Sequence, residues 1–315
     1  MRNLKPETPN PKLETRNPKL SKTLIVVCGP TAVGKTKLAI ELALHLNTEI
    51  ISADSRQLYH EIPIGTAQPT KEQLGTVKHH FISERSIAES YNAGMFERDA
   101  LERLDEIFKT HQQAVVCGGT GLYIKALCEG LDDLPKADEI IREKLMQQLE
   151  KDGLESLQKQ LKKLDPVHYS KMDVQNPQRV IRALEVCLST GKPFSSFHLD
   201  KKKNRPFKIV KIGLQLPKEE LNIRIDKRVD AMLANGWLQE VKNVFDQRHH
   251  NALNTVGYKE LFAHLAGEMT LSEATEKIKT NTRRFAKRQM TWFRKDEEVK
   301  WLEKPTVDGL LRYLG

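Results

Sequence analysis

The residues with the clearest chemical meaning form the loop 29–36, GPTAVGKT, which has the spacing G-x-x-x-x-G-K-T. Its two glycines let the backbone bend so that N–H groups point at a phosphate, while Lys35 adds a positive charge and the Thr36 hydroxyl suits Mg²⁺. A strand-like apolar run precedes the loop and a helical pattern follows it, as this motif requires. The sequence therefore predicts a di- or triphosphate site formed by Gly29, Pro30, Thr31, Ala32, Val33, Gly34, Lys35 and Thr36.

An acidic residue, Asp54, follows the next apolar run, EIIS. A carboxylate at the carboxyl end of a strand, beside a phosphate loop, can hold Mg²⁺ through water or act as a general base. It can equally cap the turn that follows the strand. These residues alone leave both interpretations open.

A third apolar run, AVVC, ends in Gly118-Gly119-Thr120-Gly121 and not in an acidic residue. A motor or switch NTPase usually places its Mg²⁺ aspartate at the end of such a strand, so this ending counts against that class. The glycines indicate either close approach of the backbone to a ligand, with Thr120 offering its hydroxyl, or a simple tight turn.

His79 and His80 have no third metal ligand at a suitable spacing, and we expect them to be solvated loop residues.

Near the carboxyl terminus, residues 277–295 carry eight basic side chains and no acidic one. Ile278, Phe285 and Trp292 recur every seven positions, which predicts one apolar helical stripe. A solvated helix usually mixes both signs of charge, so the imbalance favours a surface for a phosphate backbone over a merely solvated face. The candidate phosphate contacts are Arg283, Arg284, Lys287, Arg288 and Arg294.

Strand-like and helical segments alternate from residue 23 to about 136, including a clear helix at 92–112. This alternation predicts a parallel α/β sheet of the P-loop NTPase type, with the phosphate chemistry at the carboxyl ends of its strands. The expected domains are a disordered extension (1–21), the first part of the core (22–136), a helical insertion (137–200), and a last core strand followed by a helical region (201–315).

The bulk composition supports a polyanionic partner and excludes several other classes. The chain has 51 Lys and Arg against 42 Asp and Glu, a net charge of +9. Its four scattered cysteines form no C-x-x-C pair, which argues against a zinc site or a disulfide framework and fits a reducing cytosol. No apolar run approaches the roughly 18 residues of a membrane span. We therefore expect a cytoplasmic protein without a membrane partner.

Taken together, the motifs resemble those of the tRNA dimethylallyltransferase family, also called tRNA isopentenyltransferases. The resemblance spans residues 23 to about 301 and rests on GPTAVGKT, ISADSRQLYHEIPIGTAQP, VVCGGTGLYIKAL, NPQRVIRALEV, NTVGYKE and NTRRFAKRQMTWFRK, in the family's order. It implies transfer of a dimethylallyl group from dimethylallyl diphosphate to N6 of the adenosine immediately 3′ of the anticodon, position 37, in tRNAs that read codons beginning with U. It also implies a need for Mg²⁺, a loop that holds the prenyl diphosphate rather than ATP, and a monomer.

The same resemblance implies that the helical insertion 137–200 binds tRNA. It also implies roles for particular residues. Asp54 would be the catalytic base, Thr120 and Arg142 would serve the active site, Thr31 would lie near substrate, and Thr36 would help to hold Mg²⁺. The implied contacts with the tRNA anticodon stem-loop are Asp54, Ser55, Arg56, Gln57, Gln178, Arg179, Val180, Ile181, Arg182, Asn254, Thr255, Val256, Gly257, Tyr258 and Lys259. Three other hypotheses use the same residues: a small-molecule kinase, a prenyltransferase acting on free adenylate, and an RNA-binding module without chemistry.

Overall fold

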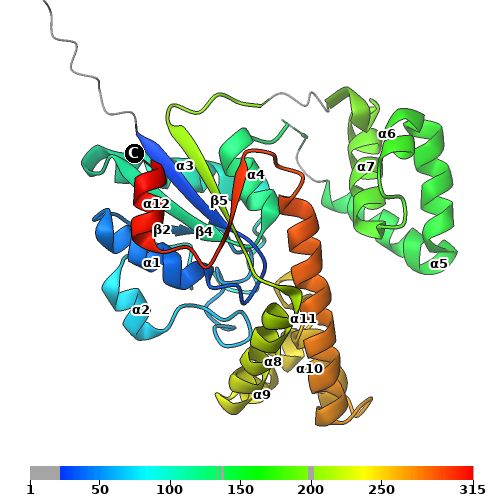
Figure 1. The fold of residues 1–315 in the computed structure, drawn as a ribbon. Helices are drawn as coiled ribbons and strands as arrows, with labels where there is room; N and C mark the ends of the chain where they lie inside the picture. Colours follow the sequence, from blue (N-terminus) through cyan, green and yellow to red (C-terminus); the bar gives the residue numbers. More distant parts are fainter. Residues whose placement is uncertain (1–21, 133, 136–137, 198–201, 315) are drawn as a thin grey trace, which may run out of the picture. The chain divides into compact units, whose positions relative to one another are not determined.

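The strands of the protein form one parallel sheet (Figure 1). The structure, a computed structural model, describes residues 22–132, 134–135, 138–197 and 202–314. Within these residues the sheet has six strands in the order β3-β2-β4-β1-β5-β6. The strands are β1 (Thr23–Cys28), β2 (Ile50–Ser52), β3 (His79–His80), β4 (Gln113–Gly118), β5 (Lys208–Gln215) and β6 (Val299–Glu303). The predicted parallel α/β core is therefore confirmed, whereas the expected extension 1–21 lies outside the described residues.

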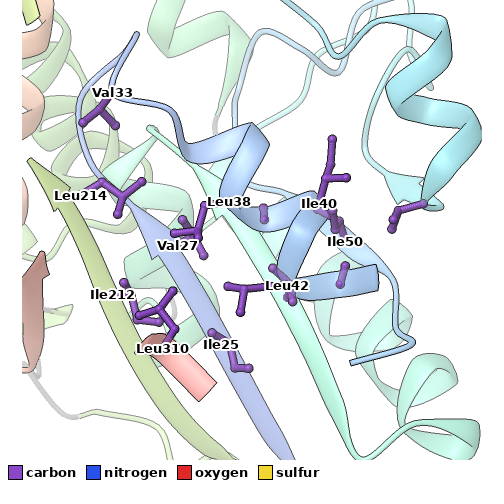
Figure 2. Packing of buried hydrophobic residues seen from close by; sticks show 14 residues of the cluster. Ile25, Val27, Val33, Leu38, Ile40, Leu42, Ile50, Ile212, Leu214 and Leu310 are labelled. Carbon is purple, nitrogen blue, oxygen red and sulfur yellow. The ribbon is translucent and has the colours of Figure 1, made fainter. Parts of the chain in front are cut away.

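The central strands are buried on both faces because helices cover the sheet on each side. Leu24 to Val27 of β1 are fully buried, which explains why this strand reads as a continuous apolar run. On one face, Leu38 and Leu42 of α1 (Lys35–His45) pack in a cluster with Val27 and with Leu214 of β5 (Figure 2). This packing fixes α1 and the loop that precedes it against the ends of β1 and β5.

Other helices cover the two faces of the sheet (Figure 1). Figure 1 shows α12 on the same side as α1, with α3 and α4 on the opposite face. These helices are α3 (Ala93–Thr110), α4 (Gly121–Glu129) and α12 (Val307–Leu314). A short helix, α2 (Lys71–Thr76), precedes β3. No helix among the described residues is both long and apolar enough to cross a bilayer.

A group of helices follows β5 and has its own apolar core around Trp237, Tyr258 and Ile278. The helices are α8 (Lys218–Ala234), α9 (Trp237–Asn243), α10 (Tyr258–Leu265) and α11 (Leu271–Phe293), with short 3₁₀ turns η2 (Phe245–Gln247) and η3 (Asn251–Leu253) between α9 and α10. Tyr59 and Ile62, from the segment after β2, belong to the same core. The cluster therefore ties these helices to the segment that carries Asp54.

Contacts divide the chain into two compact units, one made of residues 1–127 and 205–315 and the other of residues 128–204. The second unit contains α5 (Glu139–Leu164), α6 (Pro166–Lys171), α7 (Pro177–Thr190) and the turn η1 (Phe194–Phe197). Its core includes Leu157, Val180 and Leu184. A helical segment inserted between β4 and β5 therefore folds around apolar residues of its own.

Two expectations about the strands are wrong. β5 is not the last strand of the core, because β6 follows it in the chain and pairs with it in parallel at the sheet edge. An edge strand such as VKWLE is only partly buried and mixes charged with apolar residues, so it gives a weak signal. His79 and His80 form β3 and are not solvated loop residues: His80 is buried, and its Nε2 lies 2.5 Å from Glu49 Oε2.

Candidate active site

The phosphate loop joins β1 to α1 and depends on glycine at both ends. Gly29 has φ 140°, and a Cβ there would lie 2.6 Å from the carbonyl oxygen of Leu214. Gly34 has φ 109° and directly precedes the first turn of α1. No side chain larger than glycine fits at Gly29, because β5 approaches the end of β1 too closely there. The positive φ of Gly34 also favours glycine, so both ends of the loop need this residue.

Lys35 is the charged centre of this loop. Its Nζ donates a hydrogen bond to the Pro30 carbonyl oxygen at 2.8 Å, so the side chain folds back over the loop. Burial lowers the pKa of Lys35, while the charge of Asp54 acts in the opposite direction. Burial removes much of the hydration of the Lys35 ammonium, so an anion bound in the loop would stabilise the charged form.

Two arginines from α8 lie beside the loop. Arg228 donates from Nη1 to Thr31 Oγ1 at 3.3 Å, and Arg224 donates from Nη1 to the Val33 carbonyl oxygen at 3.5 Å. Burial lowers the pKa of Arg228, again opposed by Asp54. A pocket of about 290 Å³ is lined by Ala32, Gly34, Lys35, Thr36, Arg224 and Arg228. Its three cations and the loop amides are suited to a diphosphate.

Asp54 lies just beyond the carboxyl end of β2 and is half-buried. Its Oδ1 accepts hydrogen bonds from the backbone N–H of Arg56 at 2.9 Å and of Gln57 at 3.4 Å. The carboxylate therefore does cap its turn. This contact fixes the side chain and leaves its role in chemistry open, because it uses one of the two carboxylate oxygens.

The glycine turn after β4 brings Thr120 to the same place. Thr120 Oγ1 accepts a hydrogen bond from the Ser55 N–H at 3.0 Å, and the Thr120 N–H donates to the Ala53 carbonyl oxygen at 3.1 Å. The structure thus brings together Asp54, Thr120 and the loop cations, all near the carboxyl edge of the sheet.

The glycines of that turn are needed because other parts of the protein approach closely. A Cβ at Gly118 would lie 2.2 Å from the Ala53 carbonyl oxygen. At Gly119 it would lie 2.3 Å from Gln289 Nε2, and at Gly121 2.1 Å from the Trp292 ring. Helix α11 therefore packs directly on the turn that holds Thr120.

The prediction of one apolar stripe through Ile278, Phe285 and Trp292 on α11 is wrong in part. Ile278 is buried, but Phe285 and Trp292 are 40% and 39% exposed. The buried positions of α11 are Ala274, Ile278, Ala286, Gln289 and Phe293. A spacing of seven drifts by about 20° per heptad on a straight helix, so it does not follow the buried face.

The cations of α11 differ in their surroundings. Arg284, Lys287 and Arg288 are exposed, as is Arg294 at the end of the helix. Arg283 is half-buried, and its Nε donates to Asp226 Oδ1 of α8 at 3.1 Å. Arg283 therefore belongs to an ion pair within the protein, whereas its neighbours face solvent.

The predicted tRNA contacts in the first unit are partly accessible. Ser55, Arg56 and Gln57 are half-buried, and Gln57 Nε2 donates to the Ala67 carbonyl oxygen at 2.9 Å. In the stretch 254–259, Asn254 and Lys259 are exposed and Thr255 and Val256 are half-buried, whereas Gly257 and Tyr258 are buried. The Tyr258 hydroxyl donates to Glu240 Oε1 at 2.6 Å. Any effect of Tyr258 on tRNA would therefore act through the packing around it.

Arg142 lies in the second unit, where its partners also lie. Its Nη1 is 3.3 Å from Glu185 Oε2, and its Nη2 donates to Gln178 Oε1 at 2.9 Å. Arg182 also contacts Glu185, at 2.5 Å. Among the other residues predicted there to contact tRNA, Gln178 and Arg179 are exposed, while Val180 and Ile181 belong to the core of this unit.

Local patterns in the sequence do not indicate three residues of the site, Arg224, Arg228 and Gln289. The two arginines are four residues apart, which places them on one face of a helix, but α8 is mixed in charge and nothing local relates it to residues 29–36. Gln289 is a neutral residue within a basic segment. The missing signal is tertiary, since the contact between Arg228 and Thr31 spans 197 positions.

The residues at the pocket fit a magnesium ion. Thr36 lines the pocket and provides a hydroxyl oxygen, and Asp54 is close enough for its charge to act on Lys35 and Arg228. Mg²⁺ prefers oxygen ligands and commonly takes only one or two from the protein, together with substrate phosphates.

A phosphate loop at the carboxyl edge of a parallel sheet, with a carboxylate and desolvated cations beside it, defines a P-loop type of protein that acts on a phosphorylated substrate. Residues 57–296 match the family model described as IPP transferase. The chain belongs to this family.

Two curated relatives cover nearly the whole chain. A tRNA dimethylallyltransferase of Christiangramia forsetii is 56% identical over 284 residues, which are 90% of this chain and 94% of that protein. The tRNA dimethylallyltransferase 1 of Bacteroides thetaiotaomicron is 48% identical over 292 residues, 93% of this chain and 95% of that protein.

Solved structures are similar over the same extent. The full-length tRNA isopentenylpyrophosphate transferase of Bacillus halodurans is 36% identical with a TM-score of 0.67, covering 93% of this chain and 94% of that one. A eukaryotic dimethylallyltransferase described as acting on tRNA is 29% identical with a TM-score of 0.76, covering 91% of this chain and 75% of that one.

Proposed function

We propose that this protein transfers a dimethylallyl group from dimethylallyl diphosphate to N6 of adenosine 37 in tRNAs that read codons beginning with U. The observation that carries the proposal is the meeting of the cationic phosphate loop with the turns of Asp54 and Thr120, beside a basic helix. The names of the relatives support the substrate pair. We further propose that the enzyme works as a monomer in the cytoplasm.

The departure of diphosphate is the step that the loop would promote. The bond between the allylic carbon and the diphosphate oxygen breaks, and its electron pair leaves with the diphosphate. Lys35, Arg228 and the loop amides would hold the growing negative charge with little reorganisation, because they are already fixed around the pocket. A bound Mg²⁺ near Thr36 would neutralise further charge on the same group.

Asp54 would act on the acceptor. The N6 lone pair of adenine is delocalised into the purine, so the amine is a weak nucleophile. As the new C–N bond forms, the Asp54 carboxylate would orient the amine and take its proton. Thr120 is held beside it through Ser55 and would help to fix that side of the site.

The remaining proposed contacts would seat the tRNA. The target base must leave its stack to reach a pocket, which costs a few kcal/mol. Arg284, Lys287 and Arg288 on α11, which packs on the Thr120 turn, would bind backbone phosphates nearby. The accessible residues at 54–57, 178–182 and 254–259 would add further contacts, and Arg142 would contribute from the second unit.

The test is transfer of label from dimethylallyl diphosphate, with Mg²⁺, to an unmodified tRNA whose adenosines occupy positions 36–38. We expect label on the wild-type acceptor and none on a tRNA with guanosine at position 37. The Asp54→Asn variant should lose transfer and still bind tRNA, whereas Asp105→Asn, an exposed aspartate of α3, should behave as the wild type. Absence of label with the wild-type protein would refute the proposal, and preferential labelling of free AMP would indicate the adenylate prenyltransferase instead.

A further inference from the structure

Gln289 is a polar side chain of α11 that is only 7% exposed. Its Oε1 accepts a hydrogen bond from the Thr31 N–H at 2.8 Å, and its Nε2 donates to the Gly119 carbonyl oxygen at 2.9 Å. The two partners fix the orientation of the amide, since a flipped amide would face a donor with a donor and an acceptor with an acceptor. Both ends of this buried amide are therefore satisfied.

The two contacts join the two sides of the site. Thr31 belongs to the phosphate loop, whereas Gly119 precedes Thr120, whose N–H and Oγ1 bond to Ala53 and Ser55 on either side of Asp54. Gln289 thus connects the place where the leaving group is held to the place where the acceptor would be activated.

We propose that Gln289 is a positioning residue that sets the distance between the bound diphosphate and Asp54. This role rests on the proposed function. Transfer needs the allylic carbon and the amine nitrogen aligned at about 3–3.5 Å, and a misplacement of about 1 Å can cost 100-fold in rate. The diphosphate anchors the carbon and Asp54 orients the nitrogen, so the spacing of their two loops controls this alignment. Gln289 itself touches neither reacting atom.

Apolar residues beside Gln289 hold α11 in place, so the proposed role of the amide can be tested apart from support of the helix. Trp292, one turn further along α11, packs on Gly121 of the same turn, and Phe293 is buried. These apolar contacts do not depend on the amide. A side chain of similar volume without polar atoms should therefore leave α11 docked while releasing the link between the two loops.

The first test compares Gln289→Met with Thr291→Ala, an exposed position on the same helix. In single-turnover assays with saturating tRNA and donor, we expect Q289M to lose about 100-fold in the rate of transfer. Its Kd for tRNA and its Tm should stay close to the wild-type values, and T291A should match the wild type in all three.

The second test uses Gln289→Glu and a pH profile. A protonated carboxyl offers one donor and one acceptor, as the amide does, whereas the ionised form presents only acceptors to the Gly119 carbonyl oxygen. The rate of Q289E relative to the wild type at the same pH should therefore rise as the pH falls. A purely steric role for the side chain would give a constant ratio.

The outcomes distinguish the two hypotheses. If the wild type transfers label, Q289M transfers at the wild-type rate and the Q289E ratio is flat, then the role of Gln289 is refuted and the proposed function stands. If the wild type itself transfers no label, the proposed function fails, and the positioning role falls with it.

Discussion

The pocket at the phosphate loop and helix α11 both carry positive charge, but in different environments. Burial lowers the pKa of Lys35 and of Arg228, so these cations have lost much of their hydration. Arg284, Lys287 and Arg288 on α11 remain exposed. A desolvated charge acts strongly on a small anion at short range, whereas exposed charges are screened by salt and act by releasing counterions from a polyanion.

We expect this difference to divide two roles between the two sets of cations. The half-buried cations Lys35 and Arg228 should determine the rate of the chemical step, because we expect them to meet charge that develops on the leaving group. The exposed cations should determine the affinity for tRNA and its dependence on salt. Variants that reduce one of these properties and leave the other intact test this division directly.

The largest effect is expected for Lys35→Met, which removes the charge at the centre of the loop and retains most of the side-chain volume. Transfer at saturating substrates should fall about 1000-fold, the upper range for loss of one preorganised group at a developing charge. Filter binding should show a wild-type Kd for tRNA. Lys37→Met, at an exposed lysine two residues along, provides the matched control. Equal losses in both variants would contradict the assignment.

A smaller loss is expected for Arg228→Gln. The Arg228 guanidinium lines the pocket and donates a hydrogen bond to Thr31 Oγ1. After the substitution, Lys35 and the loop amides would still be there to hold the diphosphate. We expect a fall of about 100-fold in the rate of transfer, with partial recovery in Arg228→Lys. Lys227→Gln removes an exposed charge from the same helix and should have little effect. A loss in R228Q that disappears at low salt would place Arg228 with the screened cations instead.

The combined variant Arg284→Gln, Lys287→Gln and Arg288→Gln should affect binding and not chemistry. Each exposed pair contributes about 0.5 kcal/mol, so the KM for tRNA should rise about tenfold. The slope of log Kd against log salt should fall by about 2, while the rate at saturating tRNA is unchanged. A matched triple at Lys37, Lys71 and Lys109 changes the net charge equally and serves as the control. A changed single-turnover rate would show that the helix also takes part in the chemical step.

The sequence allowed the phosphate loop and the parallel core to be predicted, because each depends on local patterns, whereas the placing of Asp54 and Thr120 in one site came from the family resemblance. A glycine-rich loop between a strand and a helix carries its own geometry. The carboxyl ends of parallel strands share one edge of the sheet, so residues that follow β2 and β4 lie at that edge, and the pairing of these two strands in the structure makes them neighbours.

The rest of the site depends on contacts that local patterns do not encode. The bond between Gln289 and Thr31 spans 258 positions, and a glutamine on a basic helix resembles a solvated residue. The buried face of α11 includes Ala274, Ala286 and Gln289, which hydrophobic periodicity does not detect, so the larger Phe285 and Trp292 suggested the wrong face. Small and polar residues at a close helix contact are therefore what sequence reasoning overlooks.

The smallest effect is expected for Arg283, which carries a charge like its neighbours but is paired with Asp226. Arg283→Gln should change the Kd for tRNA less than Arg284→Gln, since a paired guanidinium offers less to a phosphate and the pair itself contributes at most about 1 kcal/mol to stability. Asp226→Asn gives the reciprocal test: it leaves Arg283 without its carboxylate and should tighten tRNA binding slightly, with a steeper dependence on salt. Equal losses in R283Q and R284Q, together with unchanged binding in D226N, would mean that Arg283 contacts the tRNA despite its partner, and that pairing within the protein does not separate the cations of α11.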